Sequence, residues 1–536
     1  ISIGQLYNYL LKLKRMNLVK KYNLLIFLFL FLIFFKSDFR IINELRCCQD
    51  DFDYYSHALT IAKDFDFDYS NQISNNSRYY NENTGKVAPM GFFGPGLLAS
   101  PFLFLGNILD NIFNVKQDIL NFKKLLYSFS SIFYLYFSFF LLIKSLNQTK
   151  LFFSLPLALS GSGIIYYAFE RYSMPHVYEI FTVSLLIYLS DKFYKDESHF
   201  SSALIPLAIS IGFIVRWTNY YLFFIPLIVF LLSKDNKKRL LREKYFYFSS
   251  ALAFSLFLLH TKLIYGVFTF SPFLVYGEEN LGTKVYESLF VDFFQTLYQV
   301  INDIFIILFT QEFGLFWFSS VLFACLFMLI VNFFKYTFKL RLAVLLVFLS
   351  FAQGFYTISI WNSTASSYGF RYIFSLIPLA IFLLAKLGEN KKNTLFKHYI
   401  NYFSIFGILS VLFFETTEAT QLSLVPVINS FGVEKIYSQP DYLSGVVMSF
   451  FEINSYLKIF ATSFFGALAI KAFLIIFGLS SLESIILNLN LSNKEDLIDL
   501  VIKIETIDLS VLVVSFLFSI YVVFLYVNLI FKNSSD

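Results

Sequence analysis

The sequence predicts an all-α polytopic membrane protein, and its composition, its hydrophobic blocks and its charge placement all favour this fold class. Of 536 residues, 57% are hydrophobic and only 15% are charged, and the mean hydropathy is +0.64. A soluble chain of this length would divide into domains with charged exteriors. Here the apolar residues form blocks of roughly 17–25, which is the helix length that crosses about 30 Å of hydrocarbon.

Basic residues cluster between the apolar blocks, at 12–21, 234–244, 335–341 and 386–397. The positive-inside rule places these clusters on the cytoplasmic side of the membrane. Basic clusters can also bind nucleic acid, but between spans they are typical topology signals, so we expect no nucleic-acid partner.

With these loops inside, we predict about thirteen transmembrane helices, an inner N-terminus and an outer C-terminus. The first run lacks a small-residue cleavage site and is expected to be a retained anchor. The predicted spans are 22–37, 121–143, 150–168, 174–190, 201–216, 219–233, 245–264, 314–334, 341–360, 371–387, 399–414, 456–478 and 509–531.

The apolar segment 92–113 is left out of that set because it is rich in glycine and proline, which interrupt helices. We predict a half-buried or re-entrant segment here, within a large first outer loop that holds interfacial helices. The residues concerned are Gly94, Pro95, Gly96, Pro101 and Gly106.

The predicted spans divide the chain into two parts. Residues 1–400 form the first part, a catalytic module that includes outer loop 38–120. Residues 401–536 add C-terminal helices, outer loop 415–455 and an amphipathic cytoplasmic segment at 480–508. The long loops are on the outer side, so we expect the chemistry at the outer membrane face.

The first outer loop begins with three carboxylates, Asp50, Asp51 and Asp53, followed by Tyr54. Ionised groups close to lipid are costly unless they are paired or functional. Crowded acids also raise one another's pKa, which suits a proton acceptor. The alternative is a solvated acidic loop.

Basic groups recur on the same predicted face. Lys86 precedes the glycine- and proline-rich segment and could hold an anion, although a snorkelling lysine is an equal alternative. Three helix ends carry arginines, in the strings Glu170-Arg171 to His176, Arg216 to Asn219, and Arg371-Tyr372. Single arginines there are commonly anchors, but three opposite an acidic loop indicate a site.

Together these residues resemble the polytopic C-type glycosyltransferases, a superfamily that includes protein O-mannosyltransferases and bacterial lipid A aminoarabinose transferases. The resemblance covers roughly residues 22–390, with Asp51 where the family has Glu and with an interrupted Lys-Pro-Pro segment. The matching motifs are Asp50-Asp51-x-x-Tyr54-x-x-x-Ala58, Lys86 to Pro89 with Phe104-Leu105-Gly106, Arg216-x-x-Asn219, Gly314-Leu315-Phe316, and Trp361 followed by Gly369-Phe370-Arg371-Tyr372.

The resemblance implies transfer of a sugar from a polyprenyl-phosphate donor to an acceptor hydroxyl, with inversion, in which the acceptor is a lipid, a glycan or a protein. Asp50 would be the general base, and Asp51 would orient Lys86, a partner of the base, or a divalent cation such as magnesium, manganese or calcium. The expected donor phosphate-binding residues are Lys86, Arg216 and Arg371, and the expected pocket residues are Tyr54, Glu170, His176, Asn219 and Tyr372.

The resemblance also implies a location in the bacterial inner membrane, with the active site on the periplasmic side. Two alternatives remain: a transporter or flippase of lipid-linked or small solutes, and a polysaccharide polymerase or ligase. Transporters usually show inverted repeats and charges near mid-span, whereas here the polar residues gather at the outer ends. Polymerases and ligases use a late outer loop rich in Arg and His, and loop 415–455 contains neither.

Overall fold

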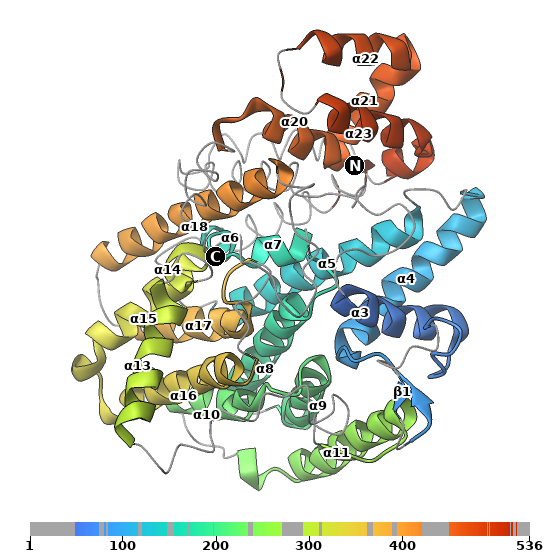
Figure 1. Cartoon of the computed structure of the whole chain (residues 1–536). Helices are drawn as coiled ribbons and strands as arrows, with labels where there is room; N and C mark the ends of the chain where they lie inside the picture. Colours follow the sequence, from blue (N-terminus) through green and yellow to red (C-terminus); the bar gives the residue numbers. More distant parts are fainter. Residues whose placement is uncertain are drawn as a thin grey trace, which may run out of the picture.

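The structure is a computed structural model (Figure 1). The predicted first span at 22–37, Cys47, Cys48 and most of outer loops 265–313 and 415–455 lie outside the described residues. The structure describes residues 49–73, 80–81, 84–115, 121–146, 155–169, 171–196, 198–233, 240–270, 293–309, 314–361, 368–388, 394–420, 450–489, 491, 494–514, 516–517 and 521.

The described chain is built of helices, which confirms the predicted all-α class. Within it, the strands β1 (Tyr80–Asn81) and β2 (Lys86–Val87) pair antiparallel as one short hairpin. The helices of the first half are α3 (Gln49–Leu59), the π-helix η1 (Thr60–Asp64), α4 (Phe93–Phe113), α5 (Phe122–Ser145), α6 (Leu155–Ser160), α7 (Ile164–Phe169), α8 (His176–Asp196), α9 (His199–Val215), η2 (Tyr220–Phe223), α10 (Phe224–Leu232), η3 (Leu240–Arg242) and α11 (Lys244–Tyr265).

The second half continues in the same way. Its helices are α13 (Phe293–Phe309), α14 (Leu315–Phe318), α15 (Ser320–Val331), η6 (Phe333–Lys335), α16 (Phe338–Trp361), η7 (Arg371–Leu376), α17 (Ile377–Gly388), α18 (Thr394–Thr420), α20 (Ile453–Thr462), α21 (Phe464–Phe477), α22 (Leu479–Asn488) and α23 (Lys494–Thr506). A helix, or two or more helices in series, therefore lies at every predicted span between residues 121 and 478.

Three described helices, α4, α5 and α11, are long and apolar enough to cross a membrane. A fourth span results if α21 and α22, which meet at a bend of 114°, are counted as one. These helices fit a membrane protein, whereas the count of about thirteen spans stays a prediction. The predicted last span, 509–531, lies only partly within the described residues.

The prediction that glycine and proline interrupt segment 92–113 is wrong, because α4 is one continuous helix of 21 residues. Pro95 lies in its first turn, where a proline is tolerated. The glycines serve close packing instead. A Cβ atom at Gly94 would lie 2.4 Å from the Val215 backbone nitrogen at the end of α9, and one at Gly96 would lie 2.4 Å from the His57 Cβ of α3.

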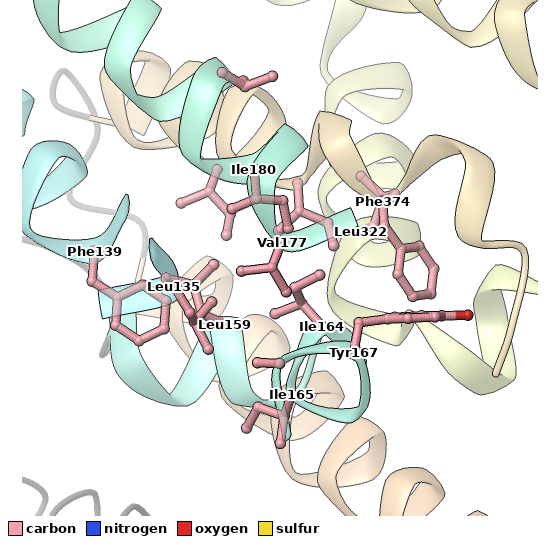
Figure 2. Close-up of a cluster of buried hydrophobic side chains, with 14 of the residues drawn as sticks. Leu135, Phe139, Leu159, Ile164, Ile165, Tyr167, Val177, Ile180, Leu322 and Phe374 are labelled. Atoms are coloured by element: carbon pink, nitrogen blue, oxygen red, sulfur yellow. The ribbon is translucent and has the colours of Figure 1, made fainter. Parts of the chain in front are cut away.

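The hydrophobic core surrounds the first turns of α8. Val177 and Ile180 of this helix lie among Leu135 and Phe139 of α5, side chains of α6, α7 and α15, and Phe374 of η7 (Figure 2). Val177 and Ile180 are fully buried. Packing of this kind fixes the orientation of the polar side chains that alternate with them on the same turns.

The C-terminal helices α20 to α23 pack against one another, and α20 also packs against α18 (Figure 1, top of the view). The predicted amphipathic segment 480–508 is helical over most of its described residues, as α22 and α23. The polar residues singled out in the sequence lie elsewhere, around α3, α8, α9 and η7.

Candidate active site

The three carboxylates of α3 have different surroundings. Asp51 is buried, and its Oδ2 lies 3.0 Å from the Arg171 guanidinium. Asp53 is also buried and accepts a hydrogen bond of 3.1 Å from the Gly91 backbone N–H. Asp50 is half-buried in the first turn of the helix, where the helix dipole stabilises a negative charge. Asp51 and Asp53 therefore fasten α3 to its neighbours, whereas Asp50 interacts electrostatically with Tyr54 and Arg371.

His57 fastens the other end of α3. Its Nδ1 lies 2.7 Å from the Tyr69 hydroxyl and its Nε2 lies 2.9 Å from the Gly91 carbonyl oxygen. Because a carbonyl only accepts, Nε2 carries the proton and Nδ1 accepts from Tyr69. Burial lowers the pKa of His57 from 6.5 to about 3, so the ring is neutral at physiological pH. His57 thus holds α3 against Gly91, in the segment that leads into α4, and against Tyr69.

A second polar cluster lies where α8 begins and α9 ends. Glu179 is fully buried in the first turn of α8. Its two carboxylate oxygens lie 3.3 and 3.2 Å from Arg216 Nη1. His176 Nδ1 lies 3.1 Å from the same carboxylate. A buried charge of this kind is stable only when it is paired and hydrogen-bonded, and here Glu179 and Arg216 compensate each other.

Two arginines meet at one aromatic ring. The Arg216 guanidinium carbon lies 4.9 Å from the centroid of the Tyr372 ring, and that of Arg371 lies 5.3 Å from it. The ring of Phe92, just before α4, lies 6.0 Å from Arg216. Aromatic faces attract cations at these distances and hold a guanidinium plane in place. Segments far apart in sequence therefore bring two cations together.

Tyr54 of α3 links the acidic helix to this pair of arginines. Burial raises the pKa of its hydroxyl well above the usual 10.0, and nearby Asp50 raises the pKa further, while Arg216 and Arg371 lower it. Asp50 also interacts electrostatically with Arg371. The Tyr54 hydroxyl is therefore protonated, and a carboxylate and two guanidinium groups are close enough to influence its pKa.

The segment that carries Arg371 and Tyr372 is anchored to α7. The Tyr167 hydroxyl donates a hydrogen bond of 2.6 Å to the Tyr368 carbonyl oxygen. The Tyr167 ring also packs edge-on against His176, with ring centroids 4.6 Å apart. Gly369 has a φ of +63°, a left-handed conformation that glycine adopts without strain. This turn directs the chain back toward α8.

The structure thus brings together most of the residues predicted from sequence as a site: Asp50, Tyr54, His176, Arg216, Asn219, Arg371 and Tyr372. Asp51 instead pairs with Arg171. Glu170 lies outside the described residues. Lys86 is exposed on β2, interacts with Asp68, and lies beside Gly266 at the end of α11. Its role in donor binding stays a prediction.

The predicted metal-binding role of Asp51 also stays a prediction. The described partner of its carboxylate is Arg171. Within the part of the chain that the structure describes, no three His, Cys, Asp or Glu side chains are close enough together to hold a metal ion.

Glu179 is the main site residue that sequence reasoning missed. It lies inside the predicted span 174–190, three residues after His176, so that both side chains occupy one face of a helix. A carboxylate within an otherwise apolar span is itself a signal of function. Its partner Arg216 follows the next span, however, and nothing in the sequence shows that these two helix ends meet.

Comparison with known proteins adds no assignment to this geometry. No protein-family model matches the chain, and no curated protein sequence matches it significantly.

Proposed function

We propose that the protein is a membrane glycosyltransferase that moves a sugar from a polyprenyl-phosphate donor to an acceptor hydroxyl of a lipid, glycan or protein. The observation that carries the proposal is that Tyr54 of α3 interacts electrostatically with Asp50 of the same helix, with Arg216 at the end of α9 and with Arg371 at the start of η7. A carboxylate and two cations around one tyrosine suit a reaction that generates a phosphate anion on a lipid.

In the proposed reaction the acceptor oxygen attacks the anomeric carbon while the bond from that carbon to the phosphate oxygen breaks. Asp50 takes the proton of the acceptor hydroxyl, and the electron pair of the broken bond stays on the departing phosphate. Attack from the face opposite the phosphate inverts the anomeric configuration. The Tyr54 hydroxyl can donate a hydrogen bond to an oxygen of the donor.

Arg216 and Arg371 would stabilise the charge that grows on the departing phosphate. Charge-assisted hydrogen bonds from guanidinium groups to phosphate are strong, and they gain strength where water is excluded. The Tyr372 ring, which both guanidinium groups contact, limits their movement before the reaction. The apolar helices around the site suit a donor that is itself a membrane lipid. We place the protein in the bacterial inner membrane with the site on the periplasmic side.

The experiment that tests this function compares sugar transfer by the reconstituted wild-type chain with transfer by Asp50→Asn. Loss of a general base lowers the rate by about 10²–10⁴-fold, so Asp50→Asn should retain donor binding and lose transfer. Asp66→Asn, an exposed acid of the same outer segment, serves as the matched control and should keep wild-type activity. Full transfer by Asp50→Asn would exclude Asp50 as the base.

A further inference from the structure

The positive charge of Arg216 is offset by a buried carboxylate. Arg216 Nη1 faces both oxygens of the Glu179 carboxylate, at 3.2 and 3.3 Å. The Glu179 side chain is completely shielded from solvent and that of Arg216 is 9% exposed. Water therefore does little to screen the pair, and a phosphate beside Arg216 would experience the negative charge of Glu179 as well as the positive charge of the guanidinium.

Glu179 occupies a rigid position. Val177 and Ile180, its neighbours on α8, are buried in the hydrophobic core (Figure 2). His176, one turn earlier, lies 3.1 Å from the carboxylate. Because α8 is fixed in this way, the carboxylate cannot turn aside when an anion binds near Arg216.

The charge of the leaving group changes during the proposed reaction. The donor is a phosphodiester with one negative charge, whereas the released lipid phosphate is a monoester with a second pKa of about 6 and hence close to two negative charges at neutral pH. Two uncompensated guanidinium groups would bind this product more tightly than the donor. Tight product binding slows turnover even when the chemical step is fast.

We propose that Glu179 sets the affinity of the site for the phosphate of the carrier lipid by offsetting the charge of Arg216, so that the lipid phosphate product can leave. This inference rests on the proposed function. Glu179 acts through Arg216 and does not itself contact the reacting atoms, so it is a positioning residue that also adjusts charge. Its removal should therefore strengthen binding of the product, whereas loss of a purely structural residue would weaken it.

The test measures binding of a long-chain polyprenyl phosphate to the full chain in nanodiscs of zwitterionic lipid, with the uncharged polyprenol as a ligand control. Glu179→Gln keeps a side chain of the same shape that can hydrogen-bond to Arg216, but it removes the charge. We expect Glu179→Gln to bind polyprenyl phosphate about tenfold more tightly than the wild-type chain does. An effect of this size is what one unit charge a few ångströms beyond contact has on the affinity for an anion. Turnover should fall, and KM should fall with it.

The matched control is Asp191→Asn on the same helix. Asp191 is likewise buried and is paired with Lys195 at 2.6 Å, and its substitution makes the same change in net charge. It lies about 18 Å along α8 from Glu179, at 1.5 Å per residue. Asp191→Asn should bind the lipid phosphate with the affinity of the wild-type chain. This result would show that the effect of Glu179→Gln comes from a charge near Arg216 and not from the change in net charge.

Unchanged or weaker binding by Glu179→Gln, with a wild-type chain that does bind, would overturn the inference and leave the proposed function standing. A wild-type chain that does not distinguish polyprenyl phosphate from polyprenol would instead contradict the proposed function itself.

A second comparison applies if Glu179→Gln does not fold, because removing one partner of a buried ion pair leaves an uncompensated charge. The double variant Glu179→Gln/Arg216→Gln holds two neutral amides that can hydrogen-bond to each other. It should bind the lipid phosphate within a few-fold of the wild-type chain, because the ion pair that it replaces contributes little net charge to the site. A loss of binding of tenfold or more would show that Arg216 acts with its full charge and would overturn the inference.

Discussion

At the scale of single residues, the site shows that neighbouring acids can serve different purposes. Asp51 forms a buried ion pair with Arg171, and Asp53 accepts a backbone hydrogen bond from Gly91. Both interactions hold α3 in place. Asp50, half-buried in the same helical turn, lies near Tyr54 and Arg371. The sequence shows three acids within four residues, but only the tertiary contacts distinguish the structural acids from the proposed base.

His57 gives a prediction about pH. Its pKa in the folded chain is about 3, below the ordinary 6.5, so the unfolded chain binds the proton first as the pH falls. Where the unfolded state binds more protons than the folded state, stability decreases as the pH falls. The contribution of His57 to stability is therefore fully present above about pH 6.5 and is lost progressively toward pH 3. The thermal midpoint should fall less for His57→Gln than for the wild-type chain between about pH 7.5 and pH 5.

The glutamine amide is neutral throughout this range and can hydrogen-bond to Tyr69 and Gly91, the partners of His57. It therefore removes the titration without removing the polar contacts. An equally steep fall in the midpoint of His57→Gln would show that other groups produce the pH dependence.

Arg216, Asn219, Arg371 and Tyr372 could be predicted from sequence as site residues because each lies next to the end of an apolar run. Glu179 is marked in the sequence only as a carboxylate within such a run, and its pairing with Arg216 could not be predicted because the two residues are distant in sequence. The same holds for Tyr167, whose hydroxyl binds the Tyr368 carbonyl across 201 residues of chain. Local sequence indicates which residues are polar at the membrane surface, whereas tertiary structure decides which of them meet.

At the scale of elements, α4 shows why the predicted interruption of segment 92–113 is wrong. Glycine and proline disfavour an isolated helix, and segment 92–113 was therefore expected to be interrupted. In the folded chain the glycines of α4 face neighbouring backbones, as at Gly106, where a Cβ atom would lie 2.5 Å from the Lys123 Cα of α5. Small residues at helix contacts allow this close approach within membranes. The stabilisation that the α4 glycines give by close packing can be recognised only when the neighbouring helices are known.

Gly96→Ala tests this explanation. The added methyl group would lie 2.4 Å from His57 Cβ and 2.8 Å from the Ala58 nitrogen, so α3 and α4 must move apart. We expect a loss of about 1–3 kcal/mol of stability and a loss of transfer activity, because α3 carries Asp50. Thermal unfolding and transfer assays measure the two effects.

Leu105→Ala on the same helix is the control. This side chain is 48% exposed and should tolerate the change with little effect on either measurement. Wild-type stability and activity in Gly96→Ala would contradict the proposed role of the α3–α4 contact in placing Asp50.

At the scale of the whole molecule, the sequence predicts the class of the fold better than its topology. Helices occur at the predicted spans from residue 121 to residue 478, because hydrophobic runs bounded by charges are a strong local signal. Among the described helices only α4, α5 and α11 meet the length and hydropathy of a single span. Others, such as α6 and α7, are short and broken, and a hydropathy pattern cannot show how such pieces stack.

The predicted orientation can be measured by cysteine labelling in a background without Cys47, Cys48 and Cys325. Phe65, in the first outer segment, is 73% exposed, and Lys335 lies in a predicted cytoplasmic cluster. A membrane-impermeant maleimide should label Phe65→Cys in intact cells and should label Lys335→Cys only after permeabilisation. The reverse pattern would place the site on the cytoplasmic face.

The most direct test of glycosyl transfer uses the purified wild-type chain, reconstituted with a polyprenyl-phosphate sugar and an acceptor panel. We predict that each new glycoside is accompanied by one released lipid phosphate, and that its anomeric configuration, determined by NMR, is inverted relative to the donor. Movement of the intact donor across the bilayer by a folded chain, with no glycoside formed, would contradict the proposed transferase and favour transport.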